Sequence, residues 1–157
     1  MENTYRNICR IGRRAAGMTQ ERWAEAVGCS VDAIRGYEAG EYMPSDDLAM
    51  RMADAAGMPV LSHWHLFNKS AVARELLPEV HIVSLPMAVV RLLAAVQKFA
   101  AAHRADRLLE IAADGKIDEF EAMDFQAILE ELKDITGAAL MLRYAREEEE
   151  VDAERDP

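Results

Sequence analysis

The acidic stretch from Glu110 to Glu121 contains residue types that could bind a calcium ion. Its Asp114-Gly115 pair and its closing glutamate fall at places that an EF-hand loop uses for a ligand, a sharp turn and a final carboxylate. Another ligand place of such a loop holds Ala112, whose side chain has no oxygen atom. A turn between two helices accounts for the same residues, so we expect no calcium site there.

The histidines and cysteines give no pattern for a metal site or a disulfide framework. His63 and His65 are two residues apart, which places them on different sides of a helix, and no cysteine is adjacent to complete a zinc site. Cys9 and Cys29 are interpreted as reduced core residues. The chain also has no phosphate-binding glycine loop and no Gly-x-Ser-x-Gly turn. We therefore expect no metal, no cofactor and no enzymatic activity.

The residues from Met18 to Gly40 predict two short helices joined by a tight turn. Thr19 can cap the first helix, which Gly28 stops, and Ser30 can cap the second, which the glycine at position 40 ends in a left-handed conformation. Apolar residues at helical spacing give each helix one buried side, formed by Trp23, Ala24 and Val27 and by Ile34 and Tyr37, respectively. Neither helix is long enough to be stable alone, so neighbouring helices must supply packing.

Three flanking segments predict those neighbouring helices. The first covers residues 5–16, the second begins at Ser45, and the third covers residues 60–67. The side chains expected to face the core are Ile8, Ile11 and Ala15 in the first segment and Leu48, Met52 and Ala56 in the second. The predicted fold class is all-α, with a five-helix domain over residues 1–67.

This arrangement resembles the phage repressor and Cro family, the XRE-type helix-turn-helix transcriptional regulators. The matching residues are Arg13, Met18-Thr19-Gln20-Glu21, Trp23-Ala24, Val27-Gly28, Ser30, Ile34, Glu38, Gly40 and Pro44-Ser45. The resemblance covers about the first 40 percent of the chain. It implies double-stranded DNA as a partner and an ion pair in which Arg13 of the first helix binds Glu38 of the third.

The resemblance also implies where DNA would be contacted. It places base contacts at the exposed positions of the third helix, which here are Ser30, Val31, Asp32, Ala33 and Gly36, with Arg35 beside them. Gln20 would donate to a phosphate at a helix N-terminus. We take Gln20, Ser30, Val31, Asp32 and Arg35 as the DNA-binding residues. This is a weak set, because major-groove specificity usually comes from Arg, Lys, Asn or Gln.

The charge distribution separates two parts of the chain, which carries a net charge of −10. Residues 1–67 hold seven arginines, no lysine and nine acidic residues, so this part lacks the usual strongly basic footprint of a DNA-binding domain. The remaining 90 residues hold 11 basic and 19 acidic residues. The acidic second part is therefore expected to face away from DNA.

The second part is expected to be a linker with a short helix over residues 68–84, a helical hairpin over residues 85–150 and an acidic tail over residues 151–157. Pro86 fits the first turn of a single long helix that runs to about residue 113. Asp118 and Glu121 form a capping-box pattern that opens the next helix. In that helix, apolar residues alternate by three and four: Phe125, Ile128, Leu132, Ile135, Ala139 and Leu142.

A hairpin with so wide an apolar surface would leave part of it exposed in a monomer. We expect it to form a homodimer as a four-helix bundle, with Phe125, Ile128, Leu132, Ile135 and Leu142 as the dimerisation residues. The alternative is that the hairpin folds back on its own N-terminal domain. A dimer would present two DNA-binding domains to successive major grooves of a palindrome.

Two functions are compatible with the sequence. The first is a sequence-specific, DNA-binding transcriptional regulator that acts as a dimer on a palindromic operator. The second keeps the helix-turn-helix fold as an antitoxin-like or adaptor module that binds a protein partner and binds DNA weakly or not at all. The sequence has neither a run of about 18 apolar residues nor a signal-peptide pattern, so we expect a cytoplasmic protein that does not enter a membrane.

Overall fold

A computed structural model describes residues 7–146, and its helices fall into two compact units that meet between Leu77 and Pro78. This boundary lies within residues 68–84, the stretch interpreted as a linker. The predicted acidic tail, residues 151–157, lies outside the described residues. Within residues 7–146 no β-strand forms, so the all-α prediction is confirmed.

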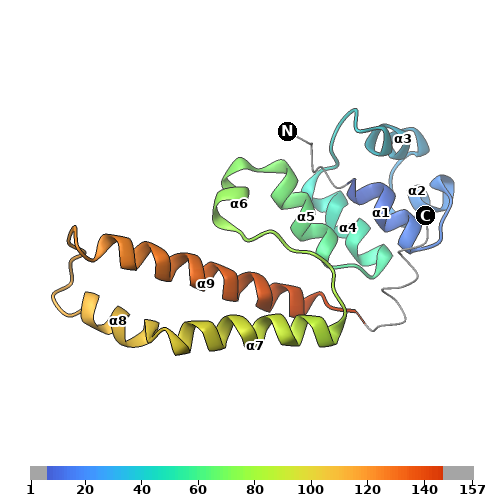
Figure 1. Ribbon diagram of the computed structural model, residues 1–157. Helices are drawn as coiled ribbons and strands as arrows, with labels where there is room; N and C mark the ends of the chain where they lie inside the picture. The colour runs from blue at the N-terminus through green and yellow to red at the C-terminus, as the bar shows by residue number, and fades with distance from the viewer. Residues whose placement is uncertain (1–6, 147–157) are drawn as a thin grey trace. The chain divides into compact units, whose positions relative to one another are not determined.

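Among the described residues, the first unit contains six helices: the first five are those of the predicted five-helix domain, and the sixth is the short helix expected within residues 68–84. Their bounds are α1 Ile8–Ala15, α2 Gln20–Val27, α3 Val31–Ala39, α4 Asp46–Ala56, α5 Val60–Lys69 and α6 Ala71–Leu76 (Figure 1). The hydroxyls of Thr19, Ser30 and Ser45 accept hydrogen bonds from backbone N–H groups three residues later, as N-caps do. Gly28 and Gly40 adopt φ angles of 71° and 77° and end α2 and α3.

The core of the first unit is built around α2 and α3. Trp23, Val27 and Ile34 are completely inaccessible to solvent, and Trp64 of α5 is also buried. The buried side of α1 differs from the prediction. Ile8, Cys9 and Gly12 face the core, whereas Ile11 is half-buried and Ala15 is exposed, because Gly12 lets Trp23 and Leu61 approach the helix closely. In α4 and α3, Ala56 and Tyr37 are only half-buried.

The second unit is a hairpin whose first arm is broken. Helices α7 (Leu85–Ala101) and α8 (Arg104–Ile111) meet at an angle of 53°, so the single long helix predicted up to about residue 113 is wrong. The break lies at His103, which adopts the left-handed conformation with φ 51°. Histidine tolerates this conformation better than most residues, and neither glycine nor proline marks the position in the sequence.

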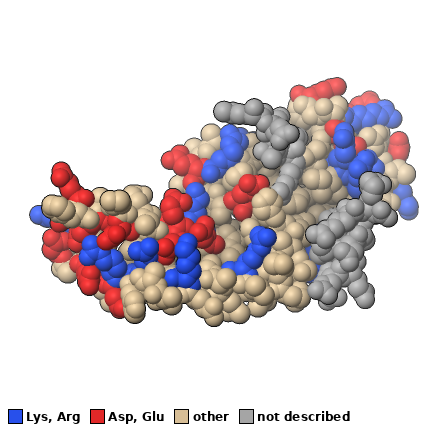
Figure 2. All heavy atoms as spheres, in the orientation of Figure 1, with Lys and Arg blue, Asp and Glu red and all other residues tan. Residues whose placement is uncertain are grey.

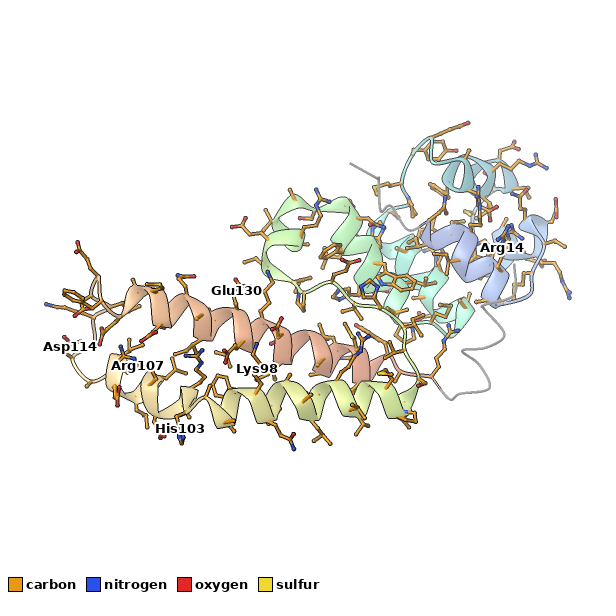
Figure 3. The ribbon with its side chains drawn as sticks, viewed as in Figure 1. Arg14, Lys98, His103, Arg107, Asp114 and Glu130 are labelled. Atoms are coloured by element: carbon orange, nitrogen blue, oxygen red, sulfur yellow. The ribbon has the colours of Figure 1, made fainter. Side chains whose placement is uncertain are left out.

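The bend at His103 brings α8 against the second arm, α9 (Ala122–Arg143). Arg104 binds both oxygens of Glu131, and Arg107 Nε lies 2.9 Å from Asp124 Oδ2. Figure 3 shows Arg107 between the two helices, while His103 points away from α9. These two ion-paired arginines give a physical reason for the break, because a straight helix would carry its last turns away from α9.

The predicted capping box before α9 is present. Asp118 Oδ1 accepts from the N–H of Glu121 at 2.9 Å, and the carboxylate of Glu121 accepts from the N–H of Asp118 at 3.3 Å. At the open end of the hairpin, Leu85 N–H donates to Arg146 O and Arg146 N–H donates to Val83 O. The open end of the second unit is therefore closed by two backbone hydrogen bonds.

The apolar row predicted on α9 lies mainly inside the hairpin. Ile128 has no accessible surface, so it is a core residue of the hairpin and is not available to a second subunit. Phe125, Ile135 and Leu142 are half-buried, and Leu132 is 37% exposed. The prediction that this row forms a dimer surface is wrong for Ile128, because the row is the one that packs on the first arm.

Within the described residues, no single helix is both long and apolar enough to cross a membrane; α7 and α8 together reach the required length and composition but are bent by 53°.

Candidate nucleic-acid interface

Helices α2 and α3 form the two arms of a helix-turn-helix, joined by Gly28, Cys29 and Ser30. The turn is closed by a hydrogen bond from Cys29 N–H to Ala24 O, and Arg51 of α4 donates from Nε to Val27 O at 2.8 Å. Both contacts satisfy carbonyls at the end of α2. The end of α2 and the turn that follows it are therefore held by these two hydrogen bonds as well as by the core.

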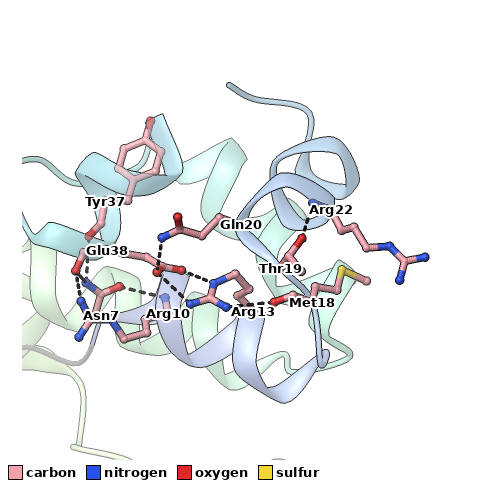
Figure 4. A network of polar contacts seen from close by, with 9 residues as sticks. All are labelled: Asn7, Arg10, Arg13, Met18, Thr19, Gln20, Arg22, Tyr37 and Glu38. Carbon is pink, nitrogen blue, oxygen red and sulfur yellow. Dashed lines mark hydrogen bonds and ion pairs between the residues drawn. The ribbon is translucent and has the colours of Figure 1, made fainter. Parts of the chain in front are cut away.

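The carboxylate of Glu38 holds α3 against α1 and α2. Arg13 binds it with two hydrogen bonds, from Nε to Oε1 at 2.6 Å and from Nη2 to Oε2 at 3.0 Å, and Gln20 Nε2 donates to Oε2 at 3.0 Å (Figure 4). Burial raises the pKa of the Glu38 carboxyl, and the hydrogen bonds from Arg13 and Gln20 outweigh it, so the pKa is lowered overall. The group is therefore a charged anchor that is only 6% exposed.

The carbonyls at the C-terminal end of α3 are bound by two side chains of the α1 region. Asn7 Nδ2 donates to Tyr37 O at 2.9 Å and to Glu38 O at 3.0 Å, and Arg10 Nη2 also donates to Glu38 O. The sequence analysis did not identify Asn7, because its partners are main-chain atoms some 30 residues away. With Arg13, these groups fix both the rotation and the end of the helix.

The residues predicted to contact DNA differ in their exposure and in the partners that they bind. Gln20 donates to Glu38, so the structure places its amide nitrogen in the scaffold and not at a free surface. Asp32 and Arg35 are both exposed on α3 and form an ion pair with each other at 2.9 Å. Ser30 is exposed and uses its hydroxyl as the N-cap, while Val31 is half-buried. The outward surface at the start of α3 is therefore polar, but its charged and hydroxyl groups already bind partners within α3.

Gly36 is not exposed, contrary to the sequence-based expectation, because the ring of Tyr42 covers it. A Cβ atom at this glycine would lie 2.3 Å from the Tyr42 hydroxyl oxygen, so no side chain fits beneath the ring. Tyr42 itself remains 48% exposed and packs edge-on against Tyr37, with ring centroids 5.0 Å apart. Gly36 lies on the side of α3 opposite the buried Ile34 and Glu38. Tyr42 thus occupies the outward side of α3 and is a site residue that the sequence analysis missed.

Two arginines provide positive charge without an internal partner. The guanidinium groups of Arg14 on α1 and Arg22 on α2 are exposed and, within residues 7–146, have no hydrogen bond or ion pair to another side chain. In Figure 4 the side chain of Arg22 extends away from the Glu38 network. These guanidiniums can bind phosphate oxygens without breaking an existing contact.

The remaining candidate groups for chemistry are internal. His65 is buried and its Nε2 lies 2.9 Å from Asp46 Oδ1, while His63 stacks on Phe67. Burial raises the pKa of the Cys9 thiol to about 12, so the thiol stays protonated. In the part of the chain that the structure describes, no three His, Cys, Asp or Glu side chains are grouped to hold a metal ion.

Comparisons with known proteins agree with this geometry. Residues 10–63 match the family described as helix-turn-helix domain. A segment of 52 residues is 44% identical to an uncharacterised HTH-type transcriptional regulator from Methanothermobacter thermautotrophicus, covering 33% of this chain and 75% of the relative. No solved structure matches the chain.

Proposed function

We propose that this chain, which belongs to the family of helix-turn-helix transcriptional regulators, binds a palindromic operator in double-stranded DNA as a homodimer and so regulates transcription. The observation that carries the proposal is the Glu38 network. Three side chains from α1 and α2 fix the orientation of α3, while its outward side remains accessible. A helix held rigidly on a scaffold with one face accessible is what insertion into a major groove requires.

In the proposed complex, α3 enters the major groove with its N-terminal residues toward the base edges, and α2 crosses the phosphate backbone. Ser30, Val31, Asp32 and Arg35 are the base-contacting residues. Arg35 would have to leave Asp32 to bind guanine, which makes the readout depend on a switch of partner. Gln20 supports the site through Glu38.

Phosphate binding falls to Arg14 and Arg22, whose charges are not neutralised by neighbouring carboxylates. Two phosphate contacts per subunit give weak binding, and two subunits on one operator double the number of contacts. This is the physical reason for a homodimer on a palindrome. We also place the chain in the XRE-type, phage repressor and Cro branch of the family, on the residues that carry the resemblance, and in the cytoplasm, where DNA is accessible.

Tyr42 adds a contact that α3 itself cannot provide. Its ring lies over Gly36 on the outward side of the helix, and its hydroxyl can donate to or accept from a base or a phosphate. The half-exposed ring can also contact a thymine methyl group. We expect Tyr42→Ala to weaken operator binding while leaving the Glu38 network intact.

The test is a selection of bound fragments from genomic DNA, followed by titration of the recovered site with the wild-type protein and with Tyr42→Ala. We expect a palindromic motif, binding that falls steeply with salt concentration, and a loss of affinity of about tenfold in the variant. Glu41→Ala, a change in the same loop that removes no ring, is the matched control. Recovery of no motif at low salt would overturn the proposal.

The second candidate function is binding of a protein partner through the same face. The Asp32–Arg35 ion pair favours it, because this pair leaves no free cation on the outward side of α3 within the described residues. A stoichiometric complex with one protein, lost on Asp32→Ala and Arg35→Ala, together with no binding to any DNA fragment, would select this function over DNA binding.

A further inference from the structure

Helix α7 is apolar on nearly its whole circumference. Its inward residues, Ala88, Leu92, Ala95 and Phe99, are buried or half-buried in the hairpin. Its outward side exposes six large apolar side chains, at 38–61% of their surface: Leu85, Met87, Val89, Val90, Leu93 and Val96. A helix that is apolar on all sides is normally covered on all sides.

The spacing of the exposed residues gives a continuous stripe along the helix. Leu85, Val89, Leu93 and Val96 follow one another by four, four and three residues, which keeps them on one side of a helix about 25 Å long. The edge of the second unit along which α7 runs is uncharged over most of its length in Figure 2. The stripe has the repeat by which helices pack on other helices.

The charge distribution of the second unit indicates where two copies of the chain can approach each other. Residues 78–157 contain 18 acidic and nine basic residues, so two copies of this unit repel each other over most of their surface. Helix α7 is the exception among the helices of the unit, because it contains no acidic residue and only Arg91 and Lys98 as charged groups. Both lie on the side of α7 away from the stripe, next to the face that packs on α9.

We propose that the exposed stripe of α7 binds the same stripe of a second copy of the chain, in an antiparallel pair related by a two-fold axis near Leu93. This residue is the midpoint of α7, so a two-fold contact there brings it against the partner's Leu93 and buries the stripe of both subunits. The contact is self-complementary, and it avoids repulsion between carboxylates because α7 contains no acidic residue. It rests on the homodimer of the proposed function and replaces the α9 row as its surface.

The test is sedimentation velocity of the full chain and two charge variants at micromolar concentration. We expect the wild type to sediment as a dimer of the 17.5 kDa chain and Leu93→Glu as a monomer, with the dissociation constant raised about 100-fold. Leu132→Glu on α9 is the matched control, because Leu132 is 37% exposed and belongs to the other apolar row. It should remain dimeric. Circular dichroism should give the same helix content for all three proteins.

Three other outcomes would contradict the α7 contact between two copies. A wild-type protein that is monomeric at 100-fold higher concentration has no such dimer. A dimer that Leu132→Glu dissociates and Leu93→Glu does not uses α9. Flotation of a monomeric wild-type protein with phosphatidylcholine–phosphatidylglycerol vesicles, lost in Leu93→Glu, would mean that the stripe covers a lipid surface.

The same samples separate this proposal from the proposed function. If Leu93→Glu dissociates the wild-type dimer but the dimer binds no genomic DNA fragment, the α7 contact stands and DNA binding fails. If a monomeric wild-type protein binds an operator fragment, DNA binding stands and the α7 contact fails.

Discussion

The two units have nearly equal lengths but bury very different amounts of apolar surface. Of the hydrophobic residues that are buried within residues 7–146, 15 lie in the first unit and five in the second. The second unit is not poor in apolar residues, since α7 alone exposes six large ones. The first unit completes a core from its own helices, whereas the second leaves an apolar face of α7 exposed.

The ion pairs of the two units also differ in how deeply they are buried. In the first unit the principal ion pair, Arg13 with Glu38, is largely buried and fixes the orientation of one helix. In the second unit Arg104 and Arg107 bind acidic partners across the surface between α8 and α9. One unit is therefore suited to hold a binding face rigidly, and the other to provide area for association.

The largest effect is expected from removing the buried isoleucine of either unit. Ile34 and Ile128 are both fully inaccessible, so replacing either with alanine should lower the free energy of unfolding by about 2–5 kcal/mol. If the units fold independently, Ile34→Ala speeds backbone hydrogen exchange only in residues 7–77 and Ile128→Ala only in residues 78–146. Faster exchange in α9 caused by Ile34→Ala would show that the two units unfold together.

The next effect concerns Glu38. Replacing it with glutamine leaves Arg13 partly buried without a counter-charge and should cost about 3 kcal/mol. Because the pKa of Glu38 is lowered by Arg13 and Gln20 against the effect of burial, its contribution is complete above the ordinary value of 4.5 and is lost as the pH falls through the lower, folded-state value. Urea unfolding from pH 6 to pH 2.5 should thus show a smaller loss of stability in Glu38→Gln than in the wild type.

The control for this pH effect is Glu131→Gln in the second unit. The pKa of Glu131 is also lowered, by the hydrogen bond from Arg104, so this variant removes an acid-dependent contribution from the hairpin and leaves that of Glu38 in place. A Glu38→Gln protein with the same slope below pH 4.5 as the wild type would mean that the Glu38 network does not stabilise the first unit.

An intermediate effect is expected on direct contacts with DNA, which are proposed for the first unit alone. Arg35→Ala should cost about 1–3 kcal/mol and relax specificity at one base pair, whereas Arg22→Ala should weaken all sequences equally and reduce the salt slope by about 1. Lys116→Ala, which removes an exposed charge from the second unit, should leave affinity unchanged. An equal loss of affinity in Lys116→Ala would mean that the hairpin also contacts DNA.

The smallest effect is expected at the break in the hairpin. His103 adopts a left-handed conformation that costs a non-glycine residue about 1–2 kcal/mol, and glycine removes this strain but adds entropy to the unfolded chain. His103→Gly should therefore change the free energy of unfolding by less than about 1 kcal/mol, while the β-branched His103→Val should destabilise by more. Thermal unfolding measures both. Greater stability of the valine variant would imply that the break straightens in solution.

The parts of the fold that depend on near neighbours could be predicted from the sequence. Thr19, Ser30 and Ser45 bond to groups three residues away, and Gly28 and Gly40 end helices because of their own φ angles. The first five helices of the first unit followed from these signals and from the apolar spacing. The break at His103 did not, because no glycine or proline marks it and its cause is the binding of α8 to α9.

The site was less predictable than the fold. The burial of Gly36 depends on where the loop places Tyr42, and the role of Asn7 depends on carbonyls at the far end of α3. For α9, the three-four spacing correctly predicted an apolar face. Spacing alone does not say whether such a face packs within the chain or against a second one, and Ile128 proved to be internal.

The two tryptophans of the chain, Trp23 and Trp64, are both buried in the first unit. Intrinsic tryptophan fluorescence of the unmodified protein therefore reports the first unit, whereas far-ultraviolet circular dichroism reports the helices of both units. A denaturation curve recorded with each signal would separate the two units without a label or a mutation. The same asymmetry makes tryptophan emission insensitive to contacts at α7, so a spectral change on adding DNA would come from the unit that carries α3.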